Sequence, residues 1–446
     1  MRHIWLYLTN GDIEIERRQC EEEGKDLSGL EEEFAKVLSL DLEDMSNQPQ
    51  AQALIDKTAA APMRADYAYV EPSDLEGIRA ESPQERSPLP TLATATLEDR
   101  VYGAWTGRCV GCLLGKPVEG WKRPRMWGYL KDTNRWPLSD YFRYDVASPE
   151  IRDRYDLQAG GAFADFVDYM PEDDDTNYTV TGLAIMKRHG PNFTPEDVAN
   201  FWLSDIPLLH TCTAERVAYR NLALLIPPPA SASHRNPYRE WIGAQIRADF
   251  WGYAAPGRPE LAAEFAWRDA CISHVKNGIY GEMWAAAMVS AAFVTADVAA
   301  LPLLALQYIP TRSRLAEAVR RVVSWYQEGV PYDDTVDRIH AQWDENFGHD
   351  WCHTISNAMV VTAALLYGQG DFARSICRAV QACFDTDCNG ATVGSILGAC
   401  LGRSALPNRW VDKIHDTLYT GVAGYHVVQL PDLTRDTLQV IERVLG

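Results

Sequence analysis

The sequence of 446 residues lacks the features that mark several large protein classes. It has no apolar run of the roughly 18 residues that a membrane-spanning helix needs, and its short N-terminal apolar patch turns acidic at once. We therefore expect no membrane contact and no signal peptide. It also lacks an excess of positive charge: the net charge of −20 disfavours nucleic acid and anionic lipid as partners. These absences predict a cytoplasmic protein whose ten cysteines are reduced and mostly buried.

The sequence also lacks the signatures of several enzyme classes. It has no GxGxxG after a strand, no phosphate-binding P-loop and no defensible Ser-His-Asp arrangement. Cys109-Val-Gly-Cys112 is spelled like a redox or zinc motif, but it lies within an expected helix. No second cysteine pair stands at zinc-ligand spacing, so we interpret the motif as core packing.

Composition and periodicity divide the chain into three regions. Residues 1–57 predict a small N-terminal appendage of mixed or irregular structure, with no role that we can assign. Residues 58–96 are rich in Ala, Pro and Ser, which predicts a linker or a segment wrapped on the surface. Residues 97–446 show helical periodicity with few strand signals, which predicts an all-α body.

Local patterns predict individual elements within these regions. Ile4–Leu8 and Ile13–Ile15 flank an Asn-Gly turn, which predicts a β-hairpin, and the acidic stretch Gly29–Leu40 predicts an amphipathic helix. Thr96 and Asp99 have the spacing of a capping box at the start of the body. Further helical patterns cover Thr176–His189, Pro195–Leu203, Leu261–Ala270, Gly281–Thr295, Arg314–Glu328, Ser356–Tyr367 and Asp371–Cys383.

Glycine recurs every four residues in two distant segments. The first series is Gly103, Gly107, Gly111 and Gly115, and the second is Gly390, Gly394, Gly398 and Gly402. Residues four apart share one face of a helix, so each series forms a smooth ridge. Each glycine costs a helix about 1 kcal/mol relative to alanine, and close approach of another backbone would compensate for that cost. We predict that both helices are central and that they are neighbours.

Two acidic clusters stand immediately before predicted helices. PEDDDTNYT holds Asp173, Asp174 and Asp175, and FDTDCNG holds Asp385 and Asp387. A single Asp at a helix start is usually a solvated cap that the helix dipole favours. Three consecutive aspartates repel one another, however, and a hard cation such as Mg²⁺ or Mn²⁺ would remove that repulsion. The residues alone leave both interpretations open, and the number of aspartates makes a second ion a hypothesis.

A third acidic string serves as a comparison. Tyr332-Asp333-Asp334-Thr335 repeats the Asp-Asp-Thr pattern, but a proline precedes it and a polar run follows it. We interpret this string as a surface turn with a structural role.

With its clusters and glycine ridges, the sequence resembles the ADP-ribosylglycohydrolase family, which includes the dinitrogenase reductase-activating glycohydrolases. The resemblance spans about residues 97–402. Three segments carry it in order: DRVYGAWTGRCVGCLLGKPVEG from Asp99 to Gly120, DDT from Asp174 to Thr176, and DTDCNGATVGSILGA from Asp385 to Ala399. The resemblance implies a compact orthogonal helical bundle with a cleft that holds two Mg²⁺ or Mn²⁺ ions.

The resemblance also implies roles for individual residues. It implies that Asp174, Asp175, Asp385 and Asp387 are metal ligands. It places Glu119, in the loop after the first core helix, near the bond that is broken; without the resemblance, Glu119 is an ordinary acid in a solvent-exposed loop.

Two positions depart from the family pattern. Asp173 and Cys388 stand where the family usually has threonine ligands. An aspartate can still bind a hard ion, so we expect Asp173 to be a ligand. A thiol is a poor ligand for Mg²⁺. With Cys388 in the ligand set, occupancy by a single ion, or a preference for Mn²⁺ or a softer metal, becomes a hypothesis.

Residues outside the clusters are candidates for substrate binding. Arg247, in GAQIR, loosely resembles a family segment on the nucleotide side of the cleft. His274, Asn277, Gly278 and Tyr280 lie in a loop-like stretch that could stack on a ribose or an adenine. The alternative is that these residues are structural, as a lone histidine usually is.

The resemblance thus implies a metal-dependent hydrolase that cleaves an N- or O-glycosidic bond at the anomeric carbon of an ADP-ribosyl or related ribosyl-nucleotide group. Asp174, Asp387 and Glu119 are the predicted catalytic residues, with Glu119 or an unengaged aspartate as the general base. The substrate is either a modified protein side chain or an NAD-derived small molecule. The alternative function, which Cys388 motivates, is a catalytically inactive protein that binds ADP-ribose or a nucleotide on the same scaffold. His353 and Asn357 could also face the cleft.

Overall fold

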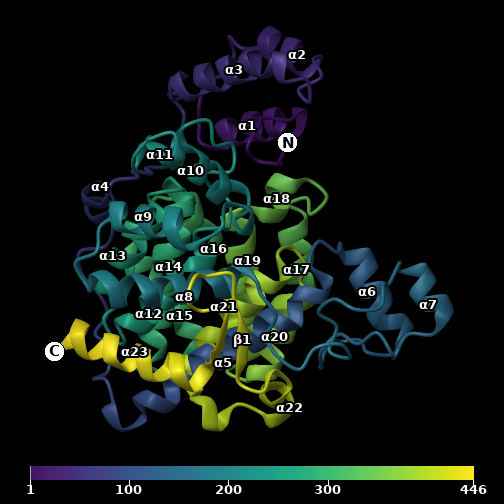
Figure 1. Cartoon of the computed structure of the whole chain (residues 1–446), viewed down its shortest axis with the longest axis vertical. Helices are drawn as coiled ribbons and strands as arrows, with labels where there is room; N and C mark the ends of the chain where they lie inside the picture. The colour runs from purple at the N-terminus through teal and green to yellow at the C-terminus, as the bar shows by residue number, and fades with distance from the viewer. Residues whose placement is uncertain (1) are drawn as a thin grey trace.

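The computed structural model describes residues 2–446. Figure 1 shows a large helical body with a smaller helical unit at one end and a lobe projecting from one side. The described residues form 23 α-helices and a single two-stranded sheet, so the predicted all-α fold class is confirmed. None of these helices combines the length and the apolar character needed to cross a membrane.

The N-terminal unit consists of α1 (Asn10–Glu22), α2 (Glu31–Leu38) and α3 (Gln48–Ala60), which share an apolar core of their own. The predicted β-hairpin is wrong, and the unit is helical rather than mixed. Thr9 starts α1 with a capping box: its hydroxyl accepts a hydrogen bond from the Asp12 amide, and the Asp12 carboxylate accepts one from the Thr9 amide. These bonds satisfy free amides at the helix start and outweigh the turn preference of Asn-Gly. The predicted amphipathic helix is α2.

The segment 61–96 joins this unit to the body and runs along its surface. It contains one short helix, α4 (Leu75–Glu81), whose Ile78 side chain is fully buried against the body. The Val70 amide donates a hydrogen bond of 3.0 Å to the Arg312 carbonyl. The segment is therefore packed rather than free.

The body contains the remaining helices and the sheet. In chain order the helices are α5 (Leu97–Gly115), α6 (Arg123–Asp132), α7 (Pro149–Arg154), α8 (Asp174–His189), α9 (Pro195–Asp205), α10 (Thr213–Ala223), α11 (Ala230–Ser233), α12 (Asp249–Ala254), α13 (Pro259–Ala270), α14 (Lys276–Ala292), α15 (Leu301–Ala305), α16 (Arg314–Gln327), α17 (Tyr332–His340), α18 (Gly348–Cys352), α19 (Thr354–Gly368), α20 (Phe372–Gln381), α21 (Thr386–Leu401), α22 (Asn408–Val411) and α23 (Leu430–Leu445). Strands β1 (Thr417–Tyr419) and β2 (Val427–Gln429) pair antiparallel. All seven helical patterns that the sequence predicts in this region correspond to helices, with ends that differ by a few residues.

Two local predictions in the body are wrong. Thr96 forms no capping box with α5, because a short 3-10 turn precedes the helix and the Thr96 hydroxyl donates to the Ala93 carbonyl instead. The Tyr332–Thr335 string begins α17 rather than a turn. Asp333 and Asp334 are exposed in the first helical turn, where the helix dipole favours acidic side chains.

The glycine-rich helices α5 and α21 pack directly against each other, as predicted. A methyl group at Gly107 would overlap the carbonyl oxygen of Gly394, and a methyl group at Gly394 would overlap that of Gly107. The same reciprocal relation links Gly103 with Gly398 and Gly111 with Gly390. The backbones touch along an antiparallel contact, and this contact is the compensation for the helix-forming cost of glycine.

The antiparallel contact also fixes which helix ends meet. The Thr386 hydroxyl, in the first turn of α21, donates a hydrogen bond of 2.9 Å to the carbonyl of Gly115, the last residue of α5. The loop that follows α5, which carries Glu119, therefore lies beside the acidic start of α21.

Candidate metal centre

Three helix ends bring acidic side chains of distant segments together. The loop after α5 supplies Glu119, the start of α8 supplies the cluster 173–175, and the start of α21 supplies Asp385 and Asp387. Glu119 is exposed and Asp174 is half-buried, whereas the other carboxylates are buried. The structure thus joins the two acidic clusters that stand apart in the sequence.

Two groups of ligand atoms share Asp387. The ligand atoms of Glu119, Asp385 and Asp387 lie within 4.8 Å of one another, and so do those of Asp175, Asp387 and Cys388. Because a carboxylate has two oxygens, Asp387 can contribute to both groups at once. This arrangement provides two adjacent places for a cation.

Asp175 has one carboxylate oxygen in use and one free. Its Oδ1 accepts a hydrogen bond of 3.0 Å from Arg108, while its Oδ2 is buried without a hydrogen-bond partner among the described residues. Burial raises the pKa of Asp175 well above its ordinary value despite the Arg108 charge. A buried carboxylate oxygen without a partner is costly, and a divalent cation would satisfy it. The donor set therefore fits a metal ion.

Arg108 holds Asp175 in place from the middle of α5. Its side chain is fully buried and donates to the Asp249 carboxylate at 2.8 Å, to the Thr179 hydroxyl at 2.6 Å and to the Ile246 carbonyl at 2.5 Å. Sequence reasoning missed this residue. The signal for it is a single charged side chain in the middle of a glycine-rich helix whose other charged residues lie in its first turn.

Asp173 has a protein partner for each of its carboxylate oxygens. As the N-cap of α8, it accepts a hydrogen bond of 2.9 Å from the Asp175 amide on Oδ1, and Lys116 Nζ donates to Oδ2 at 2.6 Å. Burial alone would raise the pKa of Asp173, but the Lys116 ammonium outweighs burial and holds that pKa below its ordinary value. To bind a metal ion, Asp173 would have to give up Lys116 or the cap.

Burial and crowding raise the pKa values of the other carboxyl groups. Burial, with the charge of Asp173, raises the pKa of Asp174 to about 8. The charge of Asp387, followed by burial, raises the pKa of exposed Glu119 to about 9. Burial and neighbouring carboxylates also raise the pKa values of Asp385 and Asp387. A cation among these groups would lower their pKa values, because positive charge favours the ionised form.

Sulfur atoms border the carboxylates on two sides. Burial, followed by the charge of Asp175, raises the pKa of the Cys388 thiol well above its ordinary value. Cys112 lies within 4.8 Å of ligand atoms of Asp173 and Asp175, and burial raises its thiol pKa in the same way. Together with Cys109, Cys112 belongs to the buried core, as the packing interpretation of the Cys-x-x-Cys string expects.

Asp174 differs from its two neighbours in the cluster. It belongs to none of the three-residue ligand groups among the described residues. Its charge acts on Cys212, whose thiol pKa is raised first by burial and then by Asp174. The Asp174 carboxylate therefore lies on the Cys212 side of the helix start.

Asn357 braces the acidic start of α21. Its Oδ1 accepts hydrogen bonds from the Asp385 amide at 3.1 Å and from Asn389 Nδ2 at 2.8 Å. Its Nδ2 donates to the carbonyls of Trp351 and His353, both at 3.0 Å. Both Asn357 and His353 are fully buried, so they support the centre from within instead of facing a cleft.

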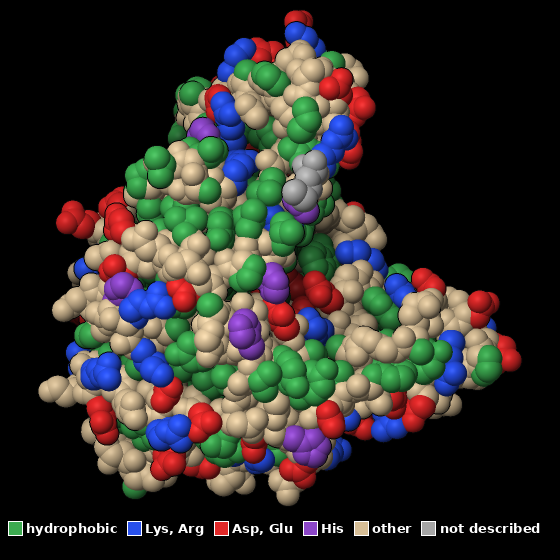
Figure 2. Space-filling view, viewed as in Figure 1, with side chains coloured by type: hydrophobic (Ala, Val, Ile, Leu, Met, Phe, Trp, Pro, Cys, Tyr) green, Lys and Arg blue, Asp and Glu red, His purple; other side chains and the backbone are tan. Residues whose placement is uncertain are grey.

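Space for a small molecule lies beside the carboxylates. Figure 2 shows a notch between the N-terminal unit and the lobe that carries α6 and α7, with acidic side chains at its bottom. A pocket of about 310 Å³ lies between the end of α5 and this lobe, and its lining includes Lys116, Trp121, Arg125 and Phe163. Lys116 thus belongs both to the pocket and to the carboxylate centre.

Comparison with known proteins identifies the family. A family model described as ADP-ribosylglycohydrolase matches residues 93–443, which is most of the chain. The chain belongs to the ADP-ribosylglycohydrolase family. A solved structure described as an ADP-ribosylglycohydrolase-related protein complex aligns with a TM-score of 0.49 and 19% sequence identity, over 78% of this chain and 99% of that chain. No curated protein matches the chain.

Five residues that were predicted to bind substrate lie in the interior of this family member. They are Arg247, His274, Asn277, Gly278 and Tyr280, all of them buried. The stretch that appears loop-like in the sequence is the start of α14, which lies beneath the N-terminal unit and the segment 61–96.

Most polar side-chain groups of these residues have protein partners, whereas His274 Nε2 is buried without one among the described residues. Arg247 donates to the Asp269 carboxylate at 2.5 Å and to the Glu215 carboxylate at 2.9 Å. Asn277 donates to the Glu240 carboxylate at 3.0 Å. These contacts give the residues a structural function, and the geometry lends no support to their prediction as substrate contacts.

Proposed function

We propose that this chain is a metal-dependent hydrolase that cleaves an N- or O-glycosidic bond at the anomeric carbon of a ribosyl group. The observation that carries the proposal is the carboxylate of Asp387, which is common to two ligand groups, next to the free buried oxygen of Asp175. Family membership supports a glycosidic substrate. Hard oxygen ligands support Mg²⁺ or Mn²⁺ as the cofactor.

Some residues of the centre would bind the metal, and others would take part in the reaction. Asp175, Asp385 and Asp387 would hold the metal, with Glu119 and Cys388 at the outer ends of the two ligand groups. Bound metal would supply Lewis-acid polarisation of a ribose hydroxyl or of a water molecule. The carboxylates themselves favour the positive character that develops at the anomeric carbon when the leaving group departs.

Glu119 is the general base in this proposal. It is the exposed carboxylate of the centre, so a water molecule can reach it. Asp174 is the second candidate, because it is half-buried and lies outside the ligand groups. In the metal-loaded centre both groups would be ionised, since positive charge offsets the repulsion that raises their pKa values.

We infer a small ribosyl compound as the substrate, in preference to an ADP-ribosylated protein. Arg247, in the segment predicted to lie on the nucleotide side, and Asn277, predicted to lie in a loop that could stack on a ribose or an adenine, are both buried and bonded to carboxylates of the protein. The pocket that remains beside Lys116 measures about 310 Å³, which suits a small group.

Turnover by metal-stripped protein tests the proposal. Protein supplied with Mg²⁺ or Mn²⁺ is incubated with NAD, simpler N-ribosides and ADP-ribosylated arginine and serine peptides, and released products are followed by mass spectrometry. We expect metal-dependent release from a small riboside and none from the D387N and D174N variants. The D334N variant is the matched control, because it alters the exposed copy of the Asp-Asp-Thr string. Full activity in D387N would contradict the assignment.

The alternative function is a non-catalytic protein that binds a ribosyl nucleotide on the same scaffold. The thiol of Cys388 within a ligand group is the observation that favours it, because a neutral thiol is a weak ligand for Mg²⁺. Saturable ADP-ribose binding without product release, with every metal tried, would select this alternative.

A further inference from the structure

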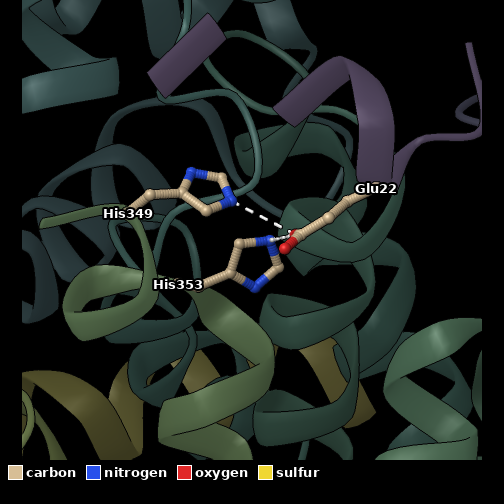
Figure 3. A group of neighbouring side chains, drawn as sticks. All are labelled: Glu22, His349 and His353. Carbon is tan, nitrogen blue, oxygen red and sulfur yellow. Dashed lines mark hydrogen bonds and ion pairs between the residues drawn. The ribbon is translucent and has the colours of Figure 1, made fainter. Parts of the chain in front are cut away.

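A second cluster with the composition of a metal site joins the N-terminal unit to the body. Figure 3 shows Glu22, at the end of α1, facing His349 and His353 from the α18–α19 region. The ligand atoms of the three side chains lie within 4.8 Å of one another, and both histidines are fully buried. Glu22 thus inserts into the body from a separate helical unit.

Hydrogen bonds to the two rings assign their protons and argue against a metal ion. The Trp241 indole N–H donates to His349 Nδ1 at 3.1 Å, and the Ile355 amide donates to His353 Nδ1 at 3.0 Å. Both partners are donors only, so each Nδ1 carries a lone pair and each neutral ring carries its proton on Nε2. The two Nε2 atoms lie 3.2 and 3.7 Å from Glu22 Oε2. They offer protons to a carboxylate and no lone pairs to a metal.

Two arginine side chains add positive charge around Glu22. Arg314 Nη1 lies 3.9 Å from Glu22 Oε2, and Arg18 Nε lies 2.6 Å from Glu22 Oε1. Neither Arg314 Nη1 nor His353 Nε2 has a hydrogen-bond partner among the described residues. Both donors therefore face a Glu22 carboxylate that does not satisfy all of its neighbours. Burial would raise the pKa of Glu22, but the His349 hydrogen bond and the nearby charges lower it to about 2. Glu22 is therefore an ionised carboxylate within a ring of donors.

The helix that Glu22 contacts is the one that supports the candidate metal centre. His353 begins α19, and its carbonyl accepts the hydrogen bond from Asn357 Nδ2. Asn357 in turn accepts from the Asp385 amide, and the Cys352 sulfur lies 3.9 Å from Asp385 Oδ2. A short chain of contacts therefore leads from the N-terminal unit to a residue of the centre.

We propose that Glu22 is a positioning residue for this centre. Its carboxylate fixes His349 and His353, these residues fix the start of α19, and Asn357 transmits that position to Asp385. The N-terminal unit is thereby a component of the active site, although it supplies no residue that touches the substrate. The catalytic consequence rests on the proposed function, whereas the structural coupling can be measured without turnover.

Substitution of Glu22 in the full-length protein tests the coupling. E22A removes the carboxylate, and E22Q retains its shape without its charge. E21A is the matched control, because Glu21 is exposed on the same helix and, among the described residues, its carboxylate pairs only with Arg17. The measurements are the Mn²⁺ dissociation constant from a titration and hydrogen exchange across residues 349–357 and 385–389.

We expect E22A to accelerate exchange in both segments and to raise the Mn²⁺ dissociation constant about tenfold, the lower end of the effect of removing a supporting partner from a metal site. E22Q should fall between wild type and E22A, and E21A should match wild type. If substrate turnover is established, kcat should fall while KM changes little, because the substrate contacts remain. If E22A does not fold, E22Q against E21A provides the same comparison.

Three results would overturn the proposal. Unchanged exchange at 385–389 in E22A would show that the contacts do not transmit position. A Mn²⁺ dissociation constant in E22A within twofold of wild type would do the same. Tight Zn²⁺ binding that E22A or H349A abolishes would contradict the proton assignment and make the cluster a metal site. If wild type binds no Mn²⁺ at all, the proposed metal centre fails, and hydrogen exchange alone then decides the coupling.

Discussion

Lys116 Nζ lies 2.6 Å from Asp173 Oδ2, so the first aspartate of the cluster carries its own counter-ion inside the candidate centre. Burial would lower the pKa of Lys116, but the charge of Asp173 outweighs burial and raises it above the ordinary value. The ammonium is therefore a permanent positive charge at neutral pH. Any divalent cation that binds to the neighbouring carboxylates binds against its repulsion.

Removal of that charge should strengthen metal binding. We expect K116M to bind Mn²⁺ about tenfold more tightly than wild type at pH 8, because Coulomb repulsion between nearby charges is large in a partly buried site. Calorimetric titration measures the difference. K131M, which removes an exposed lysine on α6, is the control. Weaker Mn²⁺ binding by K116M would show that Lys116 supports the metal instead of competing with it.

Neutralisation of Asp387 should separate stability from metal binding. Burial and nearby carboxylates raise the pKa of Asp387, so the metal-free centre is under electrostatic strain. We expect D387N to melt about 1–3 °C above wild type without metal. With added Mn²⁺, wild type should gain stability through ligand binding and D387N should not. Thermal melting with and without Mn²⁺ checks both expectations, and a D387N variant that Mn²⁺ still stabilises would contradict them.

The sequence predicts the helices and the two acidic clusters because their signals are local. Helical periodicity, the glycine series and runs of aspartate are visible within a few turns, and the α5–α21 contact follows from the glycine spacing. The partners of these residues are not local. Arg108 bonds to Asp175, and Lys116 bonds to Asp173, although the partners are far apart in the sequence. The sequence alone does not distinguish this arginine and this lysine from the others.

The misread segments have the same cause. In the N-terminal unit, a capping box at Thr9 starts a full helix where the sequence predicts a β-hairpin. Tyr280 appeared to lie in a ligand-binding loop because glycine and asparagine surround it. In the fold, its hydroxyl donates to the Pro72 carbonyl of the segment that covers it. Whether such a residue is open or covered depends on a segment some two hundred residues away.

Alanine on the glycine ridge should destabilise the protein. A methyl group at Gly107 would overlap the carbonyl oxygen of Gly394, so the two helices would have to separate. We expect G107A to cost about 1–3 kcal/mol, as overpacking of a core does. G11A is the control, because Gly11 is helical and an added methyl group would come no closer than 3.7 Å to Thr9 Oγ1. Denaturant unfolding should show G11A unchanged or slightly more stable, and an equally stable G107A would contradict the packing.

Acidification should loosen the N-terminal unit. The pKa of Glu22 is lowered to about 2, so its stabilising effect is present above pH 4.5 and disappears as the pH falls towards 2. Burial lowers the pKa of His353 to about 3, so its effect is present above pH 6.5 and is lost as the pH falls through 3. Both effects have the same sign. The protection factors of the α1 amides, which correct for the intrinsic slowing of exchange in acid, should fall between pH 6.5 and 3, most steeply below 4.5. E22Q should show a smaller change with pH than wild type, and an equal change would point to other groups.

The direct backbone contact between α5 and α21 also constrains how such a centre can diversify. Where side chains separate two helices, a substitution that changes side-chain size also changes the distance between the helix axes. Along the glycine contact there is no side chain to shorten, so we expect the separation between the Glu119 loop and Asp385 to change little when other residues are substituted. Variation is confined to the residues at the helix ends, and the lysine–aspartate pair and Cys388 are located there. We therefore expect a change of substrate to require new residues at the helix ends or an altered covering segment, and not a movement of α5 relative to α21.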